Sequence, residues 1–309
     1  MRLGVLDIGS NTGHLLVVDA SGGAAPLPAY SQKEPLRLAE HLDKSGKVDD
    51  RGVKALTQFV ATAVEVAEDK GCEEMAGFAT SAVRDARNCD AVLEHVKDKT
   101  GVDIEVLSGE DEARLTFLAV RRWFGWSSGR LAVFDIGGGS LEIAVGSDEA
   151  PDVAKSLPLG AARLTREHLQ GGRDKETVRV LRKRIRALIA RDAGSVGRAH
   201  PDHSVATSKT FRSLARICGA APATDGLLVR RVLDARTLRR MIPDLLEMSA
   251  DEVADLPGVS SSRAHQIVAG ALVADAVMDL FDLAELEICP WALREGIILE
   301  RLDQIGVRG

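Results

Sequence analysis

Aromatic side chains are scarce in this chain of 309 residues, which holds one Tyr, three Trp and seven Phe. Because 45% of the residues are nonetheless hydrophobic, the core must be built from Ala, Val, Leu and Ile. No apolar run approaches the ~20 residues that a membrane-spanning helix requires. The opening stretch, MRLGVLDIG, also lacks the charged and then apolar leader of a secretory signal. We therefore expect a cytoplasmic protein with no membrane partner.

The chain also has few cysteines and no excess of positive charge. The four cysteines form no Cys-x-x-Cys pair, so we interpret them as reduced, mostly buried thiols rather than a disulfide framework. Lys and Arg number 40 against 46 Asp and Glu, which gives a net charge of −6. Proteins that bind the nucleic-acid backbone usually carry a basic excess. We expect no nucleic-acid partner, although a local basic cleft is not excluded.

One phrase occurs twice. RLGVLDIGSNTGHLLVV, residues 2–18, returns 128 positions later as RLAVFDIGGGSLEIAVG, residues 130–146. Each copy places a Gly-rich turn between two apolar runs that are typical of strands. The period is far longer than that of a solenoid. It indicates two domains of similar fold, which we place at residues 1–127 and 128–309.

The remaining patterning alternates between helices and short strands. Val53, Leu56, Val60 and Val64 form the apolar stripe of one helix, and MAGFAT, residues 75–80, is typical of a strand. Strands that first pair through a tight turn and later alternate with helices imply an α/β sheet of mixed direction. In the second half we expect further helices over residues 174–192, 208–218, 234–247 and 261–282.

The two Gly-rich turns are candidate phosphate sites. Successive backbone N–H groups in such a turn can form an anion-binding nest, and Gly lets a phosphate approach the backbone closely. The Asp that opens each turn, Asp7 or Asp135, is placed to face a metal or a water. A plain hairpin is the alternative. Two copies in similar domains favour a phosphate site in a cleft between the domains.

The paired turns DIGSNT and DIGGGS resemble the two phosphate loops of the superfamily of sugar kinases, heat-shock ATPases and actin. Within it, the chain is similar to the exopolyphosphatase and guanosine pentaphosphate phosphatase family. The similarity continues through ATSAVRDARN, LSGEDEARLTFLAV, LPLGAARLTRE, ATSKTFRSLAR and ALREGII. It implies an α/β fold of two ribonuclease-H-like (actin-like ATPase) domains, with mixed sheets around an interdomain cleft, in the family's short two-domain form.

The resemblance assigns metal and catalytic roles to three carboxylates. Asp135 and Glu142 would hold Mg²⁺, which prefers hard oxygen ligands and substrate phosphates; in the first copy His14 stands where Glu142 stands in the second. Glu112 aligns with the family's catalytic Glu. Its ionised form is favoured near a helix N-terminus, which suits a base that orients or deprotonates a water. A solvent-facing strand residue (Glu142) and a solvated helix residue (Glu112) are the alternatives.

Phosphate binding is expected in both turns and at two further positions. Arg84 corresponds to a family Arg that faces substrate phosphate, and Arg can hold two phosphate oxygens at once; a surface ion pair with Asp85 or Asp90 is its alternative. Ser208 opens a helix after a short strand, where backbone donors can hold an oxyanion. The turn residues expected to bind phosphate are Asp7, Ser10, Asn11, Thr12, Gly137, Gly138, Gly139 and Ser140.

The helix expected near residues 173–192 is rich in basic residues around an apolar stripe. An amphipathic surface helix explains this pattern. The alternative is that Arg182, Lys183 and Arg186 flank the cleft and steer a polyanion inward.

These inferences predict an Mg²⁺-dependent exopolyphosphatase that removes terminal phosphate from inorganic polyphosphate, with Glu112 orienting the attacking water. The runner-up substrate is guanosine pentaphosphate, hydrolysed at its 5′ γ-phosphate. A sugar-kinase-like phosphotransferase is disfavoured because the second half has no convincing Gly-rich adenosine loop. A polyphosphate or nucleotide sensor is the non-enzymatic alternative. Oligomeric state is open, with a homodimer as one option.

Overall fold

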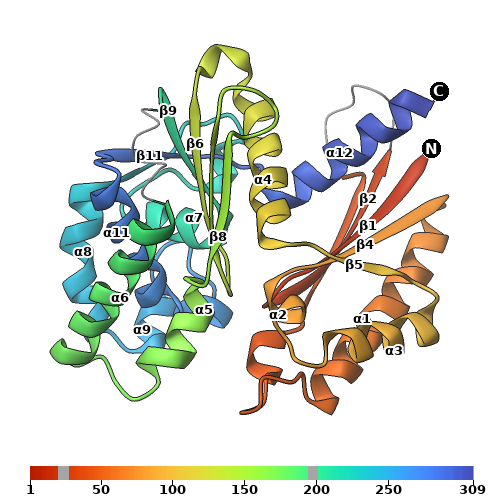
Figure 1. Ribbon diagram of the computed structural model, residues 1–309, viewed down its shortest axis with the longest axis horizontal. Helices are drawn as coiled ribbons and strands as arrows, with labels where there is room; N and C mark the ends of the chain where they lie inside the picture. Colours follow the sequence, from red (N-terminus) through yellow and green to blue (C-terminus); the bar gives the residue numbers. More distant parts are fainter. Residues whose placement is uncertain (20–27, 194–200, 309) are drawn as a thin grey trace. The chain divides into compact units, whose positions relative to one another are not determined.

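The computed structural model describes residues 1–19, 28–193 and 201–308. The chain forms two compact units, each with its own sheet and helices (Figure 1). Unit 1 comprises Met1–Glu112 together with Arg294–Gly309, and unit 2 comprises Ala113–Leu293. Within the described ranges, no helix is both long and apolar enough to cross a membrane.

Unit 1 is built on a five-stranded sheet of mixed direction, in the order β3-β2-β1-β4-β5. The first three strands form an antiparallel meander, and β4 and β5 extend the sheet in parallel with β1. The predicted hairpin followed by alternating helices and strands is therefore confirmed. The strands are β1 (Arg2–Ile8), β2 (Thr12–Asp19), β3 (Tyr30–Pro35), β4 (Glu74–Ala79) and β5 (Ile104–Val106).

Helix α1 (Asp50–Asp69) packs on one face of this sheet. Asp49 caps it by accepting a hydrogen bond from the Gly52 amide at 2.8 Å. Phe59 and its apolar neighbours share a core with Leu6 and Ile8 of β1. The other helices of this part of the chain are η1 (Leu38–His41), α2 (Ser81–Arg84), α3 (Cys89–Thr100), α4 (Gly109–Phe124) and α12 (Leu293–Arg308).

Gly13 in β2 is required by this packing. A Cβ there would lie 2.5 Å from Cε1 of Phe59 and 2.8 Å from Cδ1 of Leu36. Both distances are shorter than van der Waals contact, so a side chain at residue 13 would displace the Phe59 ring from the core.

Unit 2 repeats the same plan around a six-stranded sheet, in the order β10-β11-β9-β6-β7-β8. Its β6–β7 hairpin is antiparallel and β9 joins β6 in parallel, as β4 joins β1 in unit 1. The strands are β6 (Leu131–Ile136), β7 (Leu141–Gly146), β8 (Val153–Leu157), β9 (His203–Thr207), β10 (Val232–Asp234) and β11 (Glu285–Ile288).

Helix α11 (Ile267–Leu280) is the central helix of unit 2. It is buried along almost its whole length, and α6 and α8 pack against it. The four helices predicted for this half are present, except that the last is interrupted at His265–Gln266 and divides into α10 and α11. The remaining helices are η2 (Trp126–Ser128), α5 (Ala161–Leu164), the π-helix η3 (Thr165–Leu169), α6 (Lys175–Ala193), α7 (Ser208–Ile217), η5 (Ala223–Asp225), α8 (Ala235–Glu247), α9 (Ala250–Ala254) and α10 (Ser261–Ala264).

The division between the units differs from the boundary expected after residue 127. It falls after Glu112, within α4, and the chain returns to unit 1 at Arg294. Ala113, Phe117 and Val120 of α4 pack in one cluster with residues of β6 and β7. The repeated phrase locates the first strands of each unit, but it carries no information about which core a connecting or terminal helix joins.

Candidate active-site residues in each unit

Asp135 and Glu142 lie directly opposite each other across the β6–β7 hairpin. The turn between them is closed by a hydrogen bond from the Gly137 amide to the Ser140 carbonyl, at 2.9 Å. Ser156 on β8 donates to Oε1 of Glu142 at 2.8 Å. The Glu142 side chain is buried, so it is not the solvent-facing strand residue that was its alternative.

The electrostatics of this pair fit a cation. Burial, and then the charge of Glu142, raise the pKa of Asp135 to about 7, while Arg212 and Arg263 oppose the rise. Arg212 and Arg263 thus do not fully offset the burial of Asp135 and its repulsion from Glu142, and a divalent ion would stabilise the ionised pair further. Among the described residues no group of three or more His, Cys, Asp or Glu is placed to hold a metal. A site with two carboxylates suits Mg²⁺, which keeps several waters and takes substrate phosphates.

The turn of unit 2 is braced by the segment LPLGAARLT. The amides of Ala161 and Arg163 donate to the carbonyls of Gly137 and Gly138, each at 3.0 Å. Gly160 approaches the turn so closely that a Cβ there would overlap the backbone of Gly139 and Ser140. The turn is thus held by backbone contacts that only Gly at residue 160 permits.

Ser208 has a strained backbone at the junction of β9 and α7. Its φ is +81°, a conformation that residues with side chains rarely adopt. Its neighbour Thr207 pairs with Asp135 in the sheet, so the strained junction lies at the end of the strand next to that carboxylate. Such outliers concentrate at functional sites. Lys209 instead donates to the Gly258 carbonyl at 3.2 Å.

Two guanidinium groups that the sequence patterns did not single out lie near Asp135. Arg212 follows Ser208 by one helical turn and donates from Nε to the Ser208 carbonyl at 3.1 Å. Burial, followed by the charge of Arg212, lowers the pKa of Arg263, whereas Asp135 raises it. These arginines come from α7 and α10, and the only available sequence signal was the position of Arg212 within ATSKTFRSLAR.

In unit 1 the first turn is tied to the segment that follows β3. The Gly9 amide donates to the Thr12 carbonyl at 3.0 Å, and the Asn11 carbonyl accepts from the Leu36 and Arg37 amides. The Ser10 and Ser81 hydroxyls lie 3.1 Å apart. Ser10 and Asn11 are both buried, so the turn has a fixed conformation.

His14 and Arg294 make the first copy electrostatically different from the second. His14 lies opposite Asp7, and burial, followed by Arg294 and Lys33, lowers its pKa to about 4. Nε of Arg294 is 3.7 Å from Oδ2 of Asp7. Burial raises the pKa of Asp7 and Arg294 opposes the rise. A neutral His and a nearby guanidinium disfavour a metal ion here, so only the second copy offers the carboxylate pair.

Glu112 lies in the first turn of α4 and is paired with Arg84. Nη1 of Arg84 contacts Oε1 of Glu112, and it also donates to the Leu107 carbonyl at 3.1 Å. Nε of Arg84 lies 3.2 Å from Asp85, so one of its two alternative ion pairs is present as well. Burial disfavours the charge of Arg84, but Glu112 and Asp85 outweigh it and raise the pKa of the guanidinium. Glu112 is 6% exposed, which excludes a solvated helix residue.

Ser108 caps the start of the helix that carries Glu112. The Asp111 amide donates to the Ser108 hydroxyl at 3.1 Å, and that hydroxyl in turn lies 2.6 Å from the Asp111 carboxylate. Ser108 and Asp111 therefore have a structural role, and Glu112 is the buried carboxylate of the three in this turn.

The basic helix α6 is engaged within unit 2. Arg182 pairs with Asp275 at 3.2 Å, and Arg186 pairs with Asp279 at 2.6 Å. Arg239 of α8 contacts both acids, at 2.9 and 3.0 Å. Because Arg182 and Arg186 are already paired with acids of α11, the structure favours the surface-helix interpretation over polyanion steering.

Residues 16–305 match the model of the Ppx/GppA phosphatase family. The chain belongs to this family. Exopolyphosphatase 1 of Mycobacterium tuberculosis is 55% identical to it, over 98% of this chain and 89% of that protein. A guanosine-5′-triphosphate,3′-diphosphate pyrophosphatase of Vibrio parahaemolyticus is 27% identical, over 97% of this chain and 59% of that protein.

Among solved structures, an exopolyphosphatase from Cytophaga hutchinsonii superposes with a TM-score of 0.87 and 21% identity, over 98% of both chains. At that identity the similarity establishes the fold alone. The predicted family and the α/β fold of two mixed-sheet domains are thus confirmed, whereas the roles of individual Ppx/GppA site residues stay predictions.

Proposed function

We propose that the protein is an exopolyphosphatase that releases terminal phosphate from inorganic polyphosphate. The observation that carries this proposal is the 55% identity, over almost the full length, to a relative named for that activity. The buried carboxylate pair beside a Gly-rich turn suits phosphoryl transfer, in which positioning and electrostatic stabilisation supply most of the catalysis.

Glu112 is the proposed catalytic base. Its buried carboxylate is paired with Arg84. In this role it would accept a hydrogen bond from a water and take the proton that the water loses. Arg84 has a second proposed task, because its guanidinium can bind a phosphate of the substrate. Its pairing with Glu112 couples the position of the base to that phosphate.

Asp135 and Glu142 are the residues proposed to hold Mg²⁺. When bound, the ion supplies positive charge that neutralises the phosphate oxygens. The chain's own contribution is the turn, which the hydrogen bond from the Gly137 amide to the Ser140 carbonyl closes. Within it, Gly137 would let a phosphate approach the backbone closely, and Gly138, Gly139 and Ser140 would hold its oxygens. In the first turn the same role is proposed for Asp7, Ser10, Asn11 and Thr12, and Ser208 at the start of α7 adds a further contact.

Guanosine pentaphosphate is the second candidate substrate, because the family also includes relatives named for hydrolysis of such nucleotides. We further propose that the enzyme acts in the cytoplasm without a nucleic-acid or membrane partner, in line with its net charge of −6. A homodimer is compatible with the proposal and is not required by it.

Phosphate release on four substrates tests the assignment. Short-chain polyphosphate, long-chain polyphosphate, guanosine pentaphosphate and ATP are compared with Mg²⁺ present, and Glu112→Gln is the inactive control. We expect the highest kcat/KM on a polyphosphate. A preference for guanosine pentaphosphate would replace the proposal with the second candidate, and no release from any of the four would refute both.

A further inference from the structure

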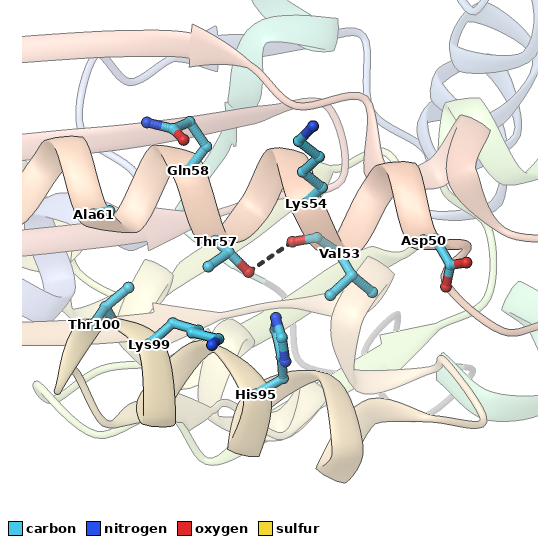
Figure 2. A pocket seen from close by; sticks show the side chains of 9 residues that line it. All are labelled: Asp50, Val53, Lys54, Thr57, Gln58, Ala61, His95, Lys99 and Thr100. Carbon is cyan, nitrogen blue, oxygen red and sulfur yellow. Dashed lines mark hydrogen bonds between the residues drawn. The ribbon is translucent and has the colours of Figure 1, made fainter.

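A pocket of about 410 Å³ opens between α1 and α3 of unit 1 (Figure 2). Its volume falls within the usual range for small-molecule sites. It takes part in none of the contacts described for the turns. Leu6 and Ile8 of β1 point into the core beneath α1, so Asp7, between them, points to the opposite face of the sheet.

The pocket is lined by basic side chains from both helices. Lys54 comes from α1, and His95 and Lys99 come from α3, where their i, i+4 spacing puts them on one face. In Figure 2 the His95 ring points toward α1 and the Lys99 side chain extends toward His95. Across the described residues, none of the three side chains has an ion-pair or hydrogen-bond partner. Asp50, at one end, is the acidic residue of the lining.

The two lysines of the pocket differ from the arginines of α6, which are paired with acids of α11. The protein is acidic overall. Two ammonium groups left unpaired around one pocket raise the local potential, which attracts anions carrying more than one charge. Because the groups are exposed, the attraction falls as salt rises.

The floor of the pocket is apolar. Val53 and Ala61 are half-buried between the helices, and the Thr57 hydroxyl donates to the Val53 carbonyl at 2.8 Å. The hydroxyl oxygen therefore faces the pocket as an acceptor, for a ligand donor such as a sugar hydroxyl. A flat ring can pack on Ala61 while phosphates reach the lysines.

We propose that the α1–α3 pocket binds a small organic anion of the nucleoside diphosphate class, with Lys54 and Lys99 on its phosphates and the ring over Ala61. The site lies on the face of the sheet opposite Asp7, so its ligand does not compete with substrate for the first turn. This proposal is independent of which polyphosphate the enzyme hydrolyses.

Titration calorimetry with ADP and with pyrophosphate tests the site in the full-length protein. Lys54→Gln/Lys99→Gln should weaken ADP binding at least about fivefold, a modest factor because each exposed charge pair contributes little. Lys44→Gln/Lys47→Gln removes two exposed lysines outside the pocket lining and should bind ADP like the parent. Ala61→Leu keeps all charges but fills the floor, and should weaken ADP while leaving pyrophosphate unchanged.

Three results would overturn the proposal. One is the absence of ADP binding at millimolar concentration. Another is an equal loss in both double variants, which would mean a general charge effect. The third is unchanged ADP binding in Lys54→Gln/Lys99→Gln. Thermal melts of each variant identify any that fail to fold, and Ala61→Leu and the lysine pair fail independently of each other.

Discussion

At the residue scale, Glu112 and Arg84 form an ion pair in which each residue has a proposed role of its own. The carboxylate is 6% exposed and Arg84 is its cationic neighbour. A buried charge without such a partner is costly, so the arginine keeps the base ionised, and its own second task on phosphate would change the environment of Glu112 as substrate arrives.

We expect Glu112→Gln to lower kcat by ~10²-fold or more, the scale of a positioned base, while the fold and the KM stay close to those of the parent. Steady-state phosphate release measures the effect. Glu110→Gln, an exposed carboxylate in the same helical turn, is the matched control and should retain activity. Near-parental turnover of Glu112→Gln would remove this residue from its proposed role.

In the metal-free protein, ionisation of Asp135 should lower the stability of the fold as pH rises. The pKa of Asp135 is about 7 in the folded state against 3.8 for the free side chain. The unfolded chain therefore releases the proton at lower pH, and the free energy of unfolding falls as pH rises between these two values. Asp135→Asn should therefore melt higher than the parent at pH 8, and the difference should vanish near pH 4. Melting curves in EDTA across this range give the answer. A constant difference between the two proteins at every pH would contradict the expectation.

At the element scale, the turn between β6 and β7 depends on the segment that packs beneath it. Gly160→Ala would press a methyl group into the backbone of Gly139 and Ser140, and such overpacking typically costs about 1–3 kcal/mol. We expect lower stability in urea and a loss of activity larger than that of the matched control. Gly171→Ala adds the same methyl where no atom lies within 4 Å. Equal behaviour of the two variants would show that the turn does not depend on this brace.

Arg121 fixes the end of α4 to the end of β7. Its guanidinium is buried and donates to the carbonyls of Gly129 at 2.8 Å and Gly146 at 3.0 Å, and to the Ser128 hydroxyl at 3.0 Å. Replacing it with Met removes the donors from the buried Gly146 carbonyl, at a cost of ~1–3 kcal/mol, and from two partly buried acceptors.

Urea unfolding should therefore show Arg121→Met destabilised by roughly 2–4 kcal/mol, the range for a broken buried network. The neighbouring Arg122 makes a partly exposed pair with Glu149 at 2.7 Å, so Arg122→Met should cost less than about 1 kcal/mol. Comparable losses in the two variants would rule out a special role for the Arg121 contacts.

The secondary-structure elements that depend on short-range sequence patterns were predicted well. The hairpins and the helices of unit 2 follow from residues close together in sequence. The interruption before α11 was not predicted, because the apolar stripe continues through it. Similarly, the charge of α6 could not be interpreted from the helix alone, since the acids that neutralise it lie 93 positions away on α11.

The same limit explains what was missed in the candidate site. Asp135, Glu142 and Glu112 could be named from their motifs, and the structure finds each of them largely enclosed. Arg212, Arg263 and Arg294 act through neighbours that only tertiary packing supplies. A basic residue in a helix gives no sequence signal of the carboxylate that it faces.

At the scale of the whole molecule, the two units share one topology but differ in the charged residues of their hairpins. Both units open with a strand–turn–strand hairpin and add a parallel strand on the same side. In unit 2 the hairpin carries Asp135 opposite Glu142, whereas in unit 1 it carries Asp7 opposite a neutral His14, with Arg294 nearby. Duplication of the fold thus did not duplicate the carboxylate pair.

This asymmetry predicts a single divalent ion per chain rather than two. A cation at the first turn would meet the positive charge of Arg294, and the hairpin there carries one carboxylate, Asp7, with Glu295 outside the hairpin as a further acid near it. The hairpin of the second turn carries two carboxylates whose repulsion the ion relieves. Mn²⁺ titrated into the protein and followed by electron paramagnetic resonance should saturate at one ion per chain. Asp135→Asn/Glu142→Gln should abolish this binding, and His14→Gln, which changes no charge at neutral pH because the pKa of His14 is about 4, should leave it intact. Two ions per chain, or a single ion that survives loss of both carboxylates, would mean that the metal is held by residues other than this pair.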